Sequence, residues 1–140
     1  MTFPVWMLLA FALWTVSLLL FTIGIYRWTR ILTGRVEIKA FRADNAQGDN
    51  WYSRAMRAHA NCIENLPVFG AIVFALYASN LSGGLIDVLA AIVLLARIGQ
   101  SIIHVVFVQT NTVAFIRFIF FFTQLICFVG LAVTVIKHAL

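Results

Sequence analysis

Four apolar segments of membrane-spanning length occupy most of this 140-residue chain. A helix needs about 20 apolar residues to cross the hydrocarbon core of a bilayer, and each of the four segments reaches that length. Lipid restricts spanning structures to helices and closed barrels, because every backbone polar group must find an internal partner. The sequence does not show the alternating strands of about ten residues that a barrel needs. The predicted spans cover residues 3–26, 59–78, 85–108 and 113–136.

The composition agrees with a membrane protein. The chain is 63% hydrophobic and only 11% charged, whereas a soluble domain is about 25% charged. We therefore predict an all-α integral membrane protein, with a single four-transmembrane-helix bundle over residues 1–140 and a polar loop at residues 27–58. Cys62 and Cys127 fall inside predicted spans, which favours apolar packing over a disulfide framework.

Positive charge is concentrated between the first two spans, whereas the connection at residues 79–84 has no Lys or Arg. Cationic loops stay on the cytoplasmic side, so residues 27–58 are predicted to be cytoplasmic; Lys137 alone opposes this orientation. Membrane topology and anionic lipid explain such charge, and no nucleic-acid partner is expected. The cations of this region are Arg27, Arg30, Arg35, Lys39, Arg42, Arg54 and Arg57.

The N-terminal segment is predicted to be the first span, not a signal peptide. It has no basic start and is followed by no small-residue cleavage site. The short chain and the lack of a targeting segment favour a bacterial inner membrane.

Polar side chains recur along one face of the second, third and fourth spans. Residues at positions i, i+4 and i+7 share a helix face. An ionisable side chain in the middle of a membrane helix costs roughly 2.5–3.5 kcal/mol, so it marks a site that faces the bundle interior. The members of these stripes, in chain order, are Arg57, Asn61, Glu64, Arg97, Gln100, Ser101, His104, Arg117 and Gln124.

With the first loop in the cytoplasm, the three stripes reach the same inner-leaflet layer. Arg57, Arg97 and Arg117 bring three positive charges to this layer, and Glu64 brings one negative charge. We expect Glu64 to pair with Arg97, which leaves about two positive charges in surplus at low dielectric. Such a surplus is costly unless an anion neutralises it. The pattern predicts a small anionic ligand, bound from the cytoplasm by guanidinium groups that suit carboxylates.

Simpler interpretations of the same residues stay open. Snorkelling of the side chain to the interface would by itself explain Arg57. The Glu64–Arg97 pair could be a purely structural ion pair between helices. His104 has only His59 as a histidine at its depth, so no metal or haem site is predicted. A transporter or channel subunit is disfavoured because the polar stripes stop in one half of the membrane.

The second span carries a motif that closely resembles the second-helix motif of the MAPEG family, the membrane-associated proteins of eicosanoid and glutathione metabolism. Arg97 and Arg117 also fall where that family places arginines, and the four-span layout fits a bacterial-type member from end to end. The motif in this chain is Arg57-x-His59-x-Asn61-x-x-Glu64-Asn65-x-Pro67-x-Phe69.

The resemblance implies a homotrimer that binds glutathione in a cytoplasm-facing pocket between adjacent subunits. By matching position, Arg57, Asn61 and Glu64 would hold the glutathione backbone. Arg97 and His104 would lie nearby. Arg117 would match the arginine that stabilises the thiolate. The implied activity is that of a glutathione transferase or peroxidase, acting on an apolar electrophile or hydroperoxide that arrives from the lipid.

Departures from the family pattern narrow this expectation. Prostaglandin-forming members have a serine and a tyrosine where this chain has Phe118 and Phe121. Some members have a histidine and a tyrosine where it has Gln100 and His104. A prostaglandin-type isomerase is therefore disfavoured. One member, the lipoxygenase-activating protein, binds lipid without being an enzyme. A non-catalytic lipid-binding or scaffold protein of the same fold is accordingly the alternative.

Overall fold

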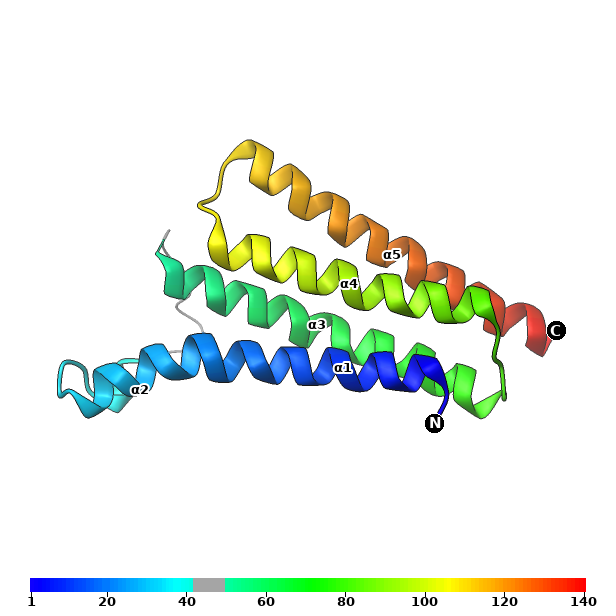
Figure 1. Cartoon of the computed structure of the whole chain (residues 1–140), viewed down its shortest axis with the longest axis horizontal. Helices are drawn as coiled ribbons and strands as arrows, with labels where there is room; N and C mark the ends of the chain where they lie inside the picture. The colour runs from blue at the N-terminus through cyan, green and yellow to red at the C-terminus, as the bar shows by residue number, and fades with distance from the viewer. Residues whose placement is uncertain (42–49) are drawn as a thin grey trace.

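The computed structural model describes residues 1–41 and 50–140, which form four long helices (Figure 1). All four are long and apolar enough to cross a membrane. The prediction of an all-α, four-helix integral membrane protein is thus confirmed. Arg42 of the predicted cationic loop lies outside the described residues. The helices are α1 (Phe3–Leu18), continued by the π-helical turn η1 (Leu19–Gly24) and α2 (Ile25–Leu32), then α3 (Trp51–Ala78), α4 (Gly84–Val106) and α5 (Asn111–Ala139).

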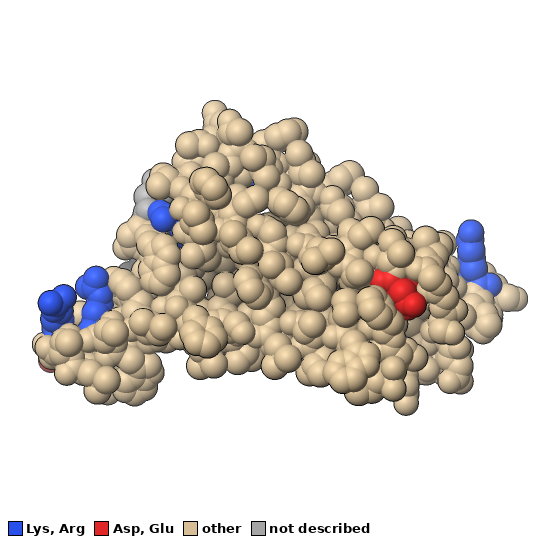
Figure 2. Space-filling view, in the orientation of Figure 1, with Lys and Arg blue, Asp and Glu red and all other residues tan. Residues whose placement is uncertain are grey.

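The four helices run up and down, so both termini and the α3–α4 turn lie at one end of the bundle (Figure 1). We call this end, with residues 1–11, 69–94 and 127–140, the terminal half. The opposite half holds α2, the short 3₁₀ helix η2 (Ile38–Ala40) and the α4–α5 turn. We call this half, with residues 15–41, 50–65 and 97–124, the basic half. In Figure 2, blue side chains gather toward the α2 end, a single blue side chain lies near the opposite end with a red one beside it, and uncharged residues fill the broad middle.

Local chemistry explains where these helices end. Gly34 has a φ of 71° and terminates α2, with Gly34 N donating to Ile31 O and Arg35 N donating to Arg30 O, both at 3.0 Å. Asn80, with a φ of 52°, ends α3 in the same way. These paired bonds are the Schellman arrangement, which needs a residue that tolerates the left-handed region.

Helix α3 begins well before the predicted second span. The apolar pattern starts near residue 59, whereas the helix starts at Trp51 because Asn50 caps it. Asn50 Oδ1 accepts a hydrogen bond from Ser53 N at 2.8 Å, which satisfies one of the unpaired donors at a helix start. Arg54, which the sequence assigned to the loop, therefore lies on the helix, and so does Arg57 of the predicted stripe.

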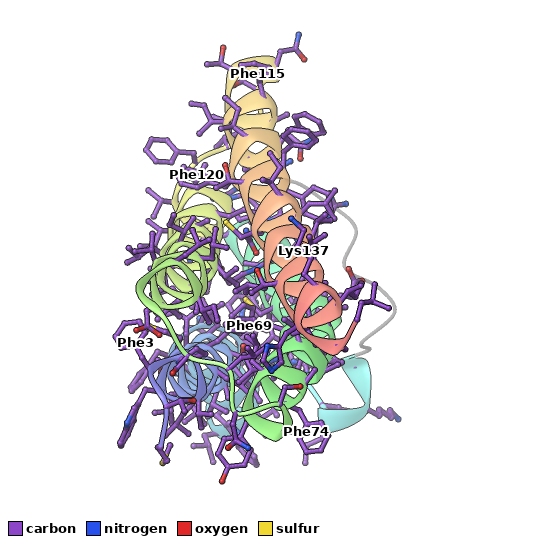
Figure 3. The ribbon with its side chains drawn as sticks, turned by 90° about the vertical axis from the view of Figure 1, so that its right-hand side faces the viewer. Phe3, Phe69, Phe74, Phe115, Phe120 and Lys137 are labelled. Atoms are coloured by element: carbon purple, nitrogen blue, oxygen red, sulfur yellow. The ribbon has the colours of Figure 1, made fainter. Side chains whose placement is uncertain are left out.

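The terminal half contains an apolar core. Phe69 is fully buried, with ring centroids of Phe11 and Phe128 at 5.8 and 6.0 Å. Figure 3 shows Phe69 among the helices, whereas Phe3 and Phe74 lie on the outside. Many large apolar side chains are exposed on the outer surface. A lipid environment accommodates this surface, since lipid tails are as apolar as leucine.

Candidate functional site

Two side-chain contacts join the polar stripes of α3 and α4. Asn61 Nδ2 donates to His104 Nδ1 at 3.3 Å. One turn deeper, Cys62 Sγ and Ser101 Oγ share a hydrogen bond at 3.4 Å. Both cysteines, Cys62 included, are free and buried. The faces that the spacing of the sequence singled out on these two helices therefore meet.

Arg97 lies on the same face of α4 and is almost completely enclosed, with 1% of its surface exposed. Its Nε and Nη2 atoms have no hydrogen-bond partner within the described residues. Its Cζ lies 5.9 Å from the centre of the Phe11 ring, which offers the cation a π-face but no acceptor. Buried donors are normally paired, so a guanidinium in this condition indicates a missing acceptor.

The polar stripe of α5 is joined to that of α4 through amide side chains. Gln100 Nε2 donates to the Arg117 carbonyl oxygen at 3.2 Å. Gln124, which is fully buried, donates from Nε2 to Gln100 Oε1 at 3.1 Å. These bonds bring the α5 turn that carries Arg117 against α4, and they leave the Arg117 side chain half-buried.

The positive charges of the layer act on one another. His104 experiences the charges of Arg57, Arg97 and Arg117, and Arg117 experiences that of Arg57. Arg57 is exposed on the surface of the single chain. Residues from α3, α4 and α5 thus form one cationic layer in the basic half, which consists of Arg57, Asn61, Arg97, His104 and Arg117.

The expected Glu64–Arg97 ion pair is wrong. Across residues 1–41 and 50–140, the one direct ion pair joins Lys39 to Glu37 at 2.9 Å. Glu64 is exposed and lines a groove of about 380 Å³ between α3 and the first helix, together with Arg27 and His59. Its charge reaches Arg97 only at longer range. Asn61 contacts α4, whereas Glu64, about 60° around α3 from it, lies on the side of this shared face that borders the first helix.

An aromatic cluster at the α2 end of the bundle was not predicted as a unit. The Tyr26 and Tyr52 rings stack at 4.2 Å, and Phe41 packs edge-on against Tyr52 at 6.2 Å. Arg27 Nε donates to Tyr52 Oη at 2.7 Å, and Arg30 Cζ lies 4.3 Å from the centre of the Tyr26 ring. The signal in the sequence was the presence of aromatic residues at both edges of the loop. The cluster ties α2 to the first turn of α3.

Fold and site together define an integral membrane four-helix protein with a layer of uncompensated guanidinium groups in one half of the bundle. Within the described residues, no group of three or more His, Cys, Asp or Glu side chains could hold a metal ion. The family model for the MAPEG family matches residues 3–137, and the chain belongs to this family. No curated protein and no solved structure matches the chain. The family includes glutathione-dependent transferases and peroxidases as well as non-catalytic members.

Proposed function

We propose that this protein is a glutathione-dependent membrane enzyme of the transferase or peroxidase type. The observation that carries the proposal is the buried Arg97 guanidinium, with two nitrogens that lack an acceptor in the described chain. Isolated buried charges are costly, and they are kept where a ligand of opposite charge neutralises them. Arg57 and Arg117 add two more positive charges to the same layer.

Glutathione fits this layer by its chemistry, because it carries two carboxylates, one amine and a thiol. Arg97 Nε and Nη2 offer donors to a carboxylate. The exposed Arg57 offers a second guanidinium, and Asn61 and His104, which contact each other, offer further polar groups. Glu64, which has no direct ion-pair partner in the described part of the chain, offers a carboxylate to the amine.

Arg117 is proposed as the catalytic residue. A free thiol with a pKa near 8.5 is only slightly ionised at neutral pH. A guanidinium beside it lowers that pKa by about two units, or about 2.7 kcal/mol in favour of the thiolate. Bound glutathione supplies the nucleophile, and the apolar electrophile or hydroperoxide reaches it from the lipid past the exposed aromatic side chains of α5.

The exposed site residues also bear on the assembly of the protein. Arg57 and Glu64 are exposed on the single chain, so a neighbouring subunit is needed to enclose a ligand that touches them. We propose a homotrimer with its basic half toward the cytoplasm of a bacterial inner membrane, which agrees with the positive-inside rule.

The test is glutathione binding to the purified protein in lipid nanodiscs. Calorimetry on the wild type should show binding, and ultraviolet difference spectra should show bound thiolate. Arg117→Ala should retain binding but reduce the thiolate population about 25-fold at pH 7, from the two-unit change in thiol pKa. Lys137→Ala, which removes a positive charge from the opposite end, is the matched control and should behave like the wild type. Absence of heat at about 1 mM glutathione, the weak end of specific binding, contradicts the proposal.

A second function, non-catalytic lipid binding, is favoured by one observation. The Phe118 and Phe122 rings stack at 5.9 Å on the outer surface of α5, next to Arg117. Aromatic surfaces of this kind suit an apolar ligand. Turnover of chlorodinitrobenzene with glutathione by the wild type, and its loss in Arg117→Ala, eliminates this second function. Fatty-acid binding without turnover favours it over the enzyme.

A further inference from the structure

Two buried amide side chains form a strap between α4 and α5. The Gln100 amide lies between two turns of α5: its Nε2 donates to the Arg117 carbonyl oxygen, and its Oε1 accepts from Gln124 Nε2. Gln124 Nε2 also donates to the Phe120 carbonyl oxygen at 3.1 Å. Gln124 is fully buried and Gln100 nearly so. We call Gln100 and Gln124 the amide strap.

The strap lies in the part of α5 that carries Arg117. In Figure 1, α5 leans away from α4 toward its N-terminal end. Phe115 and Phe118, on either side of Arg117, are exposed. Below them, the Phe120 ring lies over Gly99, where an added Cβ would come within 3.0 Å of the ring. Figure 3 shows Phe120 on the α4 side of α5. Close contact between α4 and this part of α5 thus coincides with the strap.

Amide bonds of this kind fix both the rotation and the axial position of a helix. A buried amide inside a membrane bundle that loses its partner has no water to replace it, which makes a slipped register unfavourable. Gln100 reaches the backbone of the residue that carries the catalytic guanidinium, so a change in the strap is transmitted to the Arg117 side chain without any contact with the ligand.

We infer that Gln100 and Gln124 are positioning residues, which hold the Arg117 turn of α5 against α4 and thereby set where the guanidinium lies in the cationic layer. Gln100 acts directly on the turn, and Gln124 acts through Gln100. The catalytic consequence rests on the proposed function, whereas the structural effect on α5 does not.

The test compares Gln100→Leu, Gln124→Leu and the double variant with Thr123→Val in nanodiscs. Thr123 also lies on α5. Its hydroxyl donates to the Ile119 carbonyl oxygen of the same helix, and among the contacts described it makes no bond to another helix. Hydrogen–deuterium exchange of α5 is measured without glutathione. Thiolate spectra and the glutathione dissociation constant are measured with it. Gln100→Met is prepared in parallel, so that poor folding of the leucine variant does not decide the result.

Both strap variants should raise exchange in residues 113–124, with Gln100→Leu the larger effect and the double variant equal to it, because the two residues act in series. The midpoint pH of thiolate formation should rise by about one unit as Arg117 moves away, which lowers the thiolate population about threefold at pH 7. The dissociation constant should stay near that of the wild type, because neither Gln100 nor Gln124 is among the residues proposed to hold glutathione. Thr123→Val should change none of these quantities.

Exchange that is unchanged in Gln100→Leu and Gln100→Met overturns the inference, whatever the glutathione result. Additive effects in the double variant overturn the serial arrangement. A wild type that binds no glutathione refutes the proposed function alone, and the exchange data then still decide whether the strap holds α5. Raised exchange with an unchanged thiolate midpoint overturns the positioning of Arg117.

Discussion

The terminal and basic halves of the bundle pack the same four helices with opposite kinds of interior, one apolar and one polar. In the terminal half, Phe11, Phe69 and Phe128 fill the interior with aromatic rings that need no polar partner. In the basic half, amide, hydroxyl, imidazole and guanidinium groups occupy the equivalent interior. The terminal half is satisfied by its own contacts, whereas the basic half leaves Arg97 without an acceptor among the described residues.

This difference indicates which half holds the chain together and which half is kept for a ligand. Apolar packing in a membrane depends on close contact, and it is lost when a cavity opens. Polar groups in the same medium are stabilising only when every member has a partner. Three substitutions test this division of roles.

The largest effect on stability is expected in the terminal half. Phe69→Ala should lower the free energy of unfolding by about 3 kcal/mol, because it leaves a cavity between two rings. The control is Phe74→Ala on the same helix, where the side chain is 70% exposed; its effect should be below about 0.5 kcal/mol. Chemical unfolding in detergent measures both. Equal losses would mean that the terminal half has no dominant core.

Arg97→Met should change the free energy of unfolding in the opposite direction. Removal of a buried charge that lacks an acceptor should raise the free energy of unfolding by about 2 kcal/mol, while calorimetry should show that glutathione binding is lost. Arg35→Met, at an exposed position before η2, should change stability by less than about 0.5 kcal/mol and leave binding intact. A less stable Arg97→Met protein would show that the guanidinium supports the fold, and the contrast between the halves would fail.

Gly99→Ala probes the contact between α4 and α5, and it should have the smallest effect of the three on the free energy of unfolding. The new methyl group would meet the Phe120 ring at 3.0 Å, so the ring must shift at a cost of about 1 kcal/mol. Gly70→Ala is the matched control, because its nearest neighbour, Leu8 Cδ1, lies at an ordinary 3.9 Å. The control should be neutral or gain up to about 1 kcal/mol from helix propensity. Thermal unfolding measures the stability of both variants. A stabilised Gly99→Ala protein would show that α4 and α5 are not closely packed at this position.

Much of the site was predictable residue by residue, because the helical period fixes which side chains share a face. Asn61 and His104 were placed on facing stripes, and they are in contact. The start of α3 was not predictable from hydropathy, since its first two turns are polar and depend on the Asn50 cap. The predicted pairing of Glu64 with Arg97 was also wrong. Periodicity gives the angle between residues on one helix, but it does not give the rotation of that helix toward its neighbours.

The sequence by itself determined the four apolar helices and the placing of three arginines at one depth, because hydropathy, charge and helical rise are properties of a single segment. Only the tertiary structure decided that Arg97 is enclosed while Glu64 faces outward, and that Gln100 links Gln124 to the Arg117 backbone. Those pairings depend on how each helix turns about its own axis when side chains from different segments pack together, and that rotation is set by the sum of all interhelical contacts.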